Sequence, residues 1–284
     1  MAFKIKPNIL IQVLLILASF YLLYHHAIAT LISDWSTDPN FSHGFLIPFI
    51  CLYMVWYKKN EIALIEPTPS NWGGGILIVG MVLHLAGHAG AEFFLMRFSM
   101  VVTLAGIISY CWGGKVFKKV WIPIVYLIIM IPIPAILWNK VAFPLQLMAA
   151  RFSSDLIHFI GIPVFREGNI LHLANTSLEV VDACSGLRSL TSLIALTGLF
   201  AFLAPFTNLK KWILFLSAVP IAVAVNVIRL TITAAMAFWI GPDTAHGFLH
   251  DMSGLVIFGV ALLLVYLVYL VELKIENKGR TNIE

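Results

Sequence analysis

Apolar runs, each long enough to cross a membrane as a helix, follow one another along almost the whole chain. The hydrocarbon core of a bilayer is about 30 Å thick, and an α-helix crosses it in about 20 residues. Of the 284 residues, 60% are hydrophobic and 11% are charged, which leaves too few polar side chains to cover a soluble domain. The predicted spans are residues 8–30, 42–57, 73–91, 95–113, 117–136, 185–206, 211–240 and 251–271.

The fold class that follows is an all-α polytopic membrane protein with about eight transmembrane helices. We expect one integral membrane domain over residues 1–284 and no sizeable soluble domain. Residues 137–184 depart from the pattern, because proline and charged residues interrupt them, so we expect them outside the bilayer or on its surface. Within this segment, residues 164–182 alternate in polarity around the pair Gly168-Asn169. That pattern predicts a short β-hairpin before Cys184.

The basic residues predict the orientation of the chain. If eight spans alternate, 12 of the 18 basic residues fall on one side, and basic residues favour the cytoplasmic side. Both termini are therefore predicted to be cytoplasmic. The net charge of +4 comes from these lysines and arginines, so it does not indicate nucleic-acid binding. Most residues capable of chemistry then fall on the opposite, extracytoplasmic face.

Cys184 is the first candidate for catalysis. It lies in a small polar stretch at the start of an apolar run, with Arg188 one helical turn along and Asp182 just before. A helix N-terminus and a nearby cation lower the pKa of a thiol and favour the nucleophilic thiolate. The alternative is a small residue at a helix-packing surface. Cys51 and Cys111 lie in apolar segments and are interpreted as small hydrophobic residues.

Arg229 is the second candidate, because a charge in an apolar segment costs several kcal/mol unless it has a partner. Asn226 lies three residues earlier, which predicts a polar stripe directed into the helix bundle. The alternative is a structural ion pair of Arg229. Its partners would be Asp155, Glu92 or Asp243.

His246 and His250 are four residues apart and share a face if the last helix begins near them. Neither an intervening glutamate nor an obvious third ligand accompanies them, so general acid or base catalysis is favoured over metal binding. Asp251 or Asp243 would orient the ring. No cofactor and no metal are predicted.

Three of these stretches together resemble the signatures of the exosortase/archaeosortase family, in the same order. They are Ala183-Cys184-Ser185-Gly186-Leu187-Arg188, Asn226-Val227-Ile228-Arg229 and His250-Asp251-Met252-Ser253-Gly254. Two further stretches resemble the bacterial exosortase branch, one from Asp38 through His43 to Pro48 and the other from Gly161 to Asn169. Asp182 departs from the pattern, since the family more often has glutamate there. The resemblance extends from about residue 34 to 270.

The resemblance implies a membrane-embedded cysteine transpeptidase of the bacterial inner membrane, with its active site facing the periplasm. By match of motif, Cys184 would be the nucleophile, Arg229 the stabiliser of the oxyanion or thiolate, and His250 the general acid and base. The supporting candidates are Arg188, Asn226, His246, Asp182 and His43. A one-turn shift would let His246 replace His250.

The substrates implied are membrane-tethered proteins with a C-terminal sorting signal, often Pro-Glu-Pro, followed by a transmembrane helix and a basic tail. The lipid bilayer and an exopolysaccharide or glycan machinery are the other partners that the family implies. Three alternatives stay open from the residues alone. They are a purely hydrolytic membrane protease, a non-catalytic scaffold for exopolysaccharide export, and a secondary transporter or flippase. The transporter alternative predicts paired broken helices in two halves, and the sequence contains no such pair.

Overall fold

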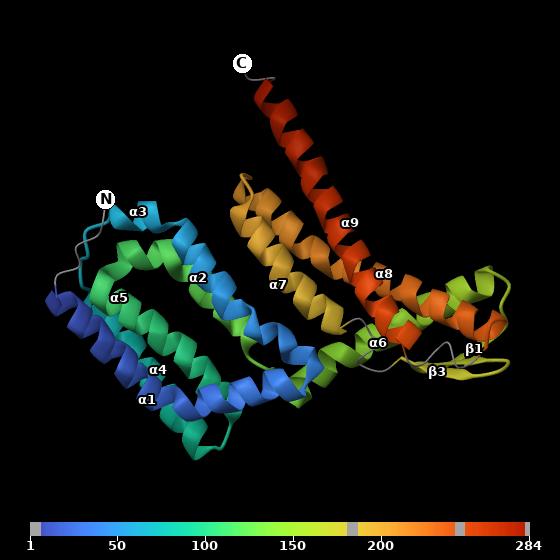
Figure 1. Ribbon diagram of the computed structural model, residues 1–284, viewed down its shortest axis with the longest axis horizontal. Helices are drawn as coiled ribbons and strands as arrows, with labels where there is room; N and C mark the ends of the chain where they lie inside the picture. The colour runs from blue at the N-terminus through green and yellow to red at the C-terminus, as the bar shows by residue number, and fades with distance from the viewer. Residues whose placement is uncertain (1–6, 181–186, 242–247, 282–284) are drawn as a thin grey trace. The chain divides into compact units, whose positions relative to one another are not determined.

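The structure, a computed structural model, describes residues 7–180, 187–241 and 248–281. Helices make up most of this part of the chain, with one small sheet (Figure 1). The chain divides into two compact units, Met1–Pro132 and Ile133–Glu284, which are described one at a time. That the whole chain works as a single membrane domain stays a prediction.

The first unit is entirely helical in its described part. Two of its helices begin at acidic N-caps: the Asp38 side chain accepts a hydrogen bond from the Asn40 backbone, and Glu92 accepts one from Leu95 at 2.7 Å. Its elements are α1 (Pro7–Thr37), the 3-10 helix η1 (Pro39–Phe45), α2 (Ile47–Tyr57), α3 (Lys59–Ala63), α4 (Asn71–Ala89), α5 (Phe93–Tyr126) and η2 (Leu127–Met130).

Glycines at a spacing of seven residues let α4 pack closely on α5. Gly73, Gly80 and Gly87 are buried. A Cβ added at Gly80 would lie 2.3 Å from the Thr103 hydroxyl, and one added at Gly73 would lie 2.3 Å from a backbone nitrogen of α5. Side chains larger than hydrogen would therefore separate the two helices, as is typical of close helix pairs in membranes.

Helix α5 consists of two helices joined at Gly113, whose φ of 84° favours glycine. The first half packs along α4. The second half returns to the end of the unit where α5 begins, because Trp35 donates a hydrogen bond to the Met130 carbonyl while Asp34, its neighbour in α1, pairs with Arg97 at 2.7 Å. The predicted segments 95–113 and 117–136 are thus two helical passes through this unit.

The second unit places a small antiparallel sheet against two helices. The strand order is β1-β2-β3, and the register pairs Glu167 with Ile170 across the predicted Gly168-Asn169 turn. The structure therefore confirms the predicted hairpin and extends it by a third strand. The elements are α6 (Ala135–Phe159), β1 (Val164–Glu167), β2 (Ile170–Leu173), β3 (Ser177–Glu179), α7 (Leu187–Leu203), α8 (Asn208–Trp239) and α9 (Phe248–Thr281).

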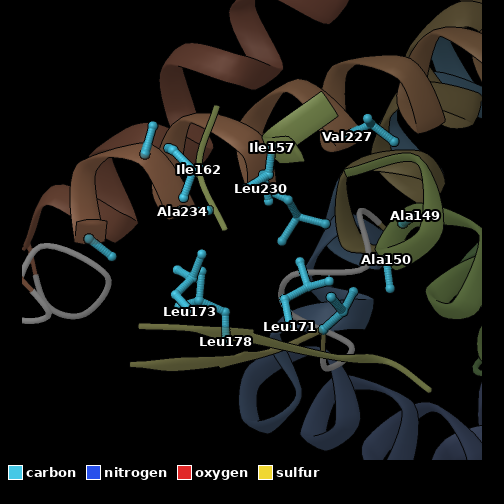
Figure 2. Close-up of a cluster of buried hydrophobic side chains, with 13 residues drawn as sticks. Ala149, Ala150, Ile157, Ile162, Leu171, Leu173, Leu178, Val227, Leu230 and Ala234 are labelled. Carbon is cyan, nitrogen blue, oxygen red and sulfur yellow. The ribbon is translucent and has the colours of Figure 1, made fainter. Parts of the chain in front are cut away.

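Apolar clusters on two sides of α8 form the core in the described part of this unit. The first lies between the sheet and helices α6 and α8, and Figure 2 shows the strand leucines facing the helix side chains across it. Its strand members include Leu171, Leu173 and Leu178. The second cluster joins α7, α8 and α9, which pack on one another. Helix α8 is therefore buried both toward the sheet and toward α7 and α9.

Every predicted span overlaps a helix in the described part of the chain, although not every helix meets a length test for crossing a membrane. Among the described residues, five helices are long and apolar enough: Ile11–Thr37, Asn71–Ala89, Phe93–Met130, Asn208–Trp239 and Gly254–Glu276. The count is below eight because α5 counts once for its two halves, α2 has 11 residues, and the apolar part of α7, Ser189–Leu203, is short. The fold is nonetheless the predicted all-α polytopic membrane protein.

Candidate active site

Arg229 is buried in α8, with 8% of its surface exposed. It continues a row of buried residues on the face that α8 turns toward α7 and α9. The row has a spacing of three or four residues, which keeps its members on one side of a helix. It comprises Leu214, Ala218, Ala222 and Val225. Arg229 therefore stands at the end of an apolar interface, one turn beyond Val225.

The guanidinium of Arg229 lies against the beginning of α9. A Cβ added at Gly254 would lie 3.8 Å from Nη2 of Arg229 and 3.9 Å from Cζ. A side chain at position 254 would therefore begin at ordinary van der Waals distance from the guanidinium. His250 is one turn before Gly254 in the same helix. The structure thus brings Arg229 to the helix that carries the predicted acid and base.

Asn226 is buried one turn before Arg229 in the same helix, with 3% of its surface exposed. Its Nδ2 has no hydrogen-bond partner within the described ranges. An amide N–H that is buried without a partner is costly, so a site that supplies an acceptor is favoured there. Arg229 and Asn226 both lie inside the bundle, where the sequence predicted a polar stripe.

The remaining predicted residues of this unit are only partly placed. Arg188 belongs to the first turn of α7, which packs on α8 and α9. Cys184, Asp182 and His246 lie outside the described residues. Strand β3 ends at Glu179, five residues before Cys184, and the Val180 backbone still donates to the Asn169 carbonyl at 2.9 Å. The sheet therefore ends only a few residues before the predicted nucleophile.

The edge of β3 that faces away from β2 pairs with no other strand in the part of the chain that the structure describes. Leu178 and Val180 direct their backbone groups toward β2, as the Val180 hydrogen bond and the register show. In an antiparallel pair the intervening residues point the other way. The backbone groups of Ser177 and Glu179 therefore lie along the outer edge.

His43 belongs to the other unit, where it lies in η1. Its Nε2 is 3.2 Å from the Ile129 carbonyl. Next to it, a Cβ at Gly44 would lie 2.1 Å from Nε1 of Trp35. Together with the hydrogen bond from Trp35 to Met130, these contacts hold η1 against η2. His43 thus belongs to the contact between η1 and η2 within the first unit.

Arg97 is a further buried charge, outside the set of predicted site residues. It is 3% exposed, pairs with Asp34 at 2.7 Å and lies 5.5 Å from the ring centre of Phe93. The signal was present, since Arg97 interrupts an apolar segment just as Arg229 does. Within the described ranges, no three side chains of histidine, cysteine, aspartate or glutamate gather as a metal site would require.

A bundle of apolar helices that buries an arginine beside the start of another helix defines a polytopic membrane protein with a polar site inside its bundle. Residues 35–267 match the family model described as Transmembrane exosortase (Exosortase_EpsH). The chain therefore belongs to the transmembrane exosortase family. The comparisons with curated proteins and with solved structures find no match.

Proposed function

We propose that this exosortase is a cysteine-type transpeptidase that cleaves C-terminal sorting signals of exported proteins. Cys184 is the nucleophile, Arg229 stabilises the oxyanion, and His250 is the general acid and base. The observation that carries the proposal is the burial of Arg229 against Gly254, one turn from His250. A fixed guanidinium in a site without bulk water stabilises a developing negative charge far better than one in water.

The reaction begins when the Cys184 thiolate attacks the carbonyl carbon of the scissile peptide bond. Arg229 donates hydrogen bonds to the oxyanion of the tetrahedral intermediate. The C–N bond then breaks, His250 gives a proton to the departing amine, and a thioester to Cys184 remains. An amine acceptor resolves the thioester by transpeptidation, or water resolves it by hydrolysis.

The proposed substrates are proteins anchored by their own transmembrane helix, with a Pro-Glu-Pro-type motif just outside it. The enzyme lies in the bacterial inner membrane with both termini in the cytoplasm and the site facing the periplasm. Such a helix holds the cleavage point at a constant depth, which favours a membrane-embedded enzyme. The proposal also includes an exopolysaccharide or glycan machinery as a partner of the enzyme.

The test is co-expression with a tagged substrate that bears a Pro-Glu-Pro-type tail. We expect wild-type protein to shorten the substrate, and both Cys184→Ala and Cys184→Ser to abolish shortening, as measured by gel shift and intact mass. A mass adduct on Cys184 of the wild type would identify the thioester. Processing that survives both substitutions would refute the cysteine mechanism and return attention to the scaffold or transporter alternatives.

We further propose that the outer edge of β3 holds the extended motif of the substrate by strand addition, just before Cys184. Glu179→Pro removes an outward N–H and keeps the pairing with β2. We expect this variant to lower the processing rate about tenfold or more, since strand addition depends on main-chain hydrogen bonds. Glu179→Ala is the matched control. If both variants process the substrate equally and Cys184 is still required, strand addition at the outer edge of β3 is refuted. The cysteine mechanism is then unaffected.

A further inference from the structure

The end of the first unit opposite η1 carries a surplus of positive charge among its described residues. Five lysines lie there against two glutamates, Glu61 and Glu66, and Lys119 pairs with Glu61 at 2.6 Å. The other lysines are Lys58, Lys59, Lys115 and Lys118. The hydrogen bond from Lys119 lowers the pKa of Glu61, which favours the charged carboxylate. Glu61 therefore offsets the charge of Lys119.

A cleft of about 740 Å³ is lined by two of these lysines, Lys115 and Lys118. One wall is the linker before α4 together with the first turn of that helix, and the other is the beginning of the second half of α5. The lining residues are Thr68, Pro69, Ser70, Trp72, Gly114, Lys115, Phe117 and Lys118. This described lining holds no acidic side chain, and two hydroxyl groups accompany the two ammonium groups.

The cleft is built by specific contacts. The Thr68 backbone donates to the Trp112 carbonyl and the Ser70 backbone to the Tyr110 carbonyl, both at 3.3 Å. The linker approaches Gly113 so closely that a Cβ there would lie 2.0 Å from the Thr68 carbonyl oxygen. These contacts hold the hydroxyl-bearing linker against the turn from which the second half of α5 begins.

The apolar side of the cleft is aromatic. Trp72 and Phe117 meet edge to face with ring centres 5.7 Å apart. Trp72 belongs to the first turn of α4, and the candidate span Asn71–Ala89 begins there. Tryptophan at the end of a span is typical of the membrane interface. This position of Trp72 predicts that the cleft lies at the depth of lipid headgroups.

We infer that this cleft binds the phosphate headgroup of an anionic phospholipid. Lys115 and Lys118 attract the phosphate, the hydroxyls of Thr68 and Ser70 donate hydrogen bonds to it, and the indole of Trp72 packs against the glycerol and the first methylenes. Basic pockets at the membrane interface bind anionic headgroups by this combination of charge and depth. The cleft shares no residue with the proposed active site.

The test measures lipid binding to the full-length protein by native mass spectrometry, with phosphatidylglycerol and phosphatidylcholine as probes. We expect wild type to retain phosphatidylglycerol in preference to phosphatidylcholine, and Lys115→Gln/Lys118→Gln to weaken that binding about tenfold. Lys58→Gln/Lys59→Gln removes the same charge at the same end outside the cleft, and we expect it to retain wild-type binding.

Equal weakening in both double variants would overturn the inference, because it would mean that diffuse charge attracts the lipid. Displacement of the lipid from wild type by excess inorganic phosphate would also overturn it, by identifying a site for free phosphate. Retention of phosphatidylglycerol in the presence of phosphate, lost only in the cleft variant, supports a headgroup site.

Discussion

Buried arginines occupy different settings in the described part of this molecule. Arg97 is paired with Asp34 at 2.7 Å, a contact that accounts for its charge within the first unit. Arg229 ends an apolar helix interface and lies close to the backbone of α9 at Gly254. In membrane proteins a charged residue inside the helix bundle is usually functional. The size of the side chain at position 254 therefore limits where the guanidinium of Arg229 lies.

We predict that Gly254→Leu lowers substrate processing about 100-fold or more, because it displaces a donor to the oxyanion. Gly254→Ala is the matched control. Its Cβ would lie 3.8 Å from Nη2, an ordinary contact, so processing within about threefold of wild type is expected. The measurement is the rate at which each variant shortens the co-expressed substrate at equal protein levels.

Arg229→Lys tests whether the positive charge alone is sufficient or whether the planar guanidinium is required. Lysine keeps the positive charge but loses the planar fork of donors, so we expect a partial loss of processing with normal folding. The measurement is the same processing rate, with thermal unfolding in detergent as the check on folding. Full activity of Gly254→Leu or of Arg229→Lys would contradict a role for the guanidinium at the oxyanion.

At the scale of elements, the glycine row of α4 sets the distance to α5. We predict that Gly80→Leu destabilises the protein by about 2 kcal/mol or more, since a Cβ there would lie 2.3 Å from the Thr103 hydroxyl. Gly75→Leu in the same helix has no atom within 4 Å of its Cβ and should be close to neutral. The measurement is thermal unfolding of the two variants in detergent. Equal stability of Gly80→Leu and Gly75→Leu would contradict close packing of α4 on α5.

The sequence predicted the hairpin strands well because their residues alternate around a strong turn pair, Gly168-Asn169. Helix α6 was not predicted as a helix, since Pro144 and several polar residues break the apolar run. Hydropathy detects apolar length, whereas α6 has a buried side that packs on α8, so tertiary contacts stabilise it.

At the scale of the whole molecule, the sequence identified Arg229 from a general rule about charges in apolar segments. The sequence did not predict that the guanidinium would lie beside Gly254. That contact joins α8 to α9, and the hydrophobic pattern of a single helix does not show which residues of two helices meet. The roles of Cys184 and His250 stay predictions from motif resemblance. Of the three proposed catalytic residues, Arg229 and His250 belong to α8 and α9, which pack on one another.

The predicted topology places both termini in the cytoplasm, and each unit can be tested separately with single cysteines. In a Cys51→Ala/Cys111→Ala/Cys184→Ser background, Ser42→Cys and Ser177→Cys should react with a membrane-impermeant maleimide added outside spheroplasts. Asn71→Cys and Thr207→Cys should react only after permeabilisation, because lysine-rich ends stay in the cytoplasm. The four sites lie in or beside η1, β3, α4 and α8, two for each unit.

Labelling of Asn71→Cys in intact spheroplasts would reverse the first unit, and labelling of Thr207→Cys would reverse the second. Reversal of the second unit would put the proposed active site on the cytoplasmic face, where an exported substrate has not yet crossed. The expected pattern instead places β3 and the C-terminal end of α8 at the periplasmic face. An anchored substrate of the proposed kind would present its cleavage motif on that face.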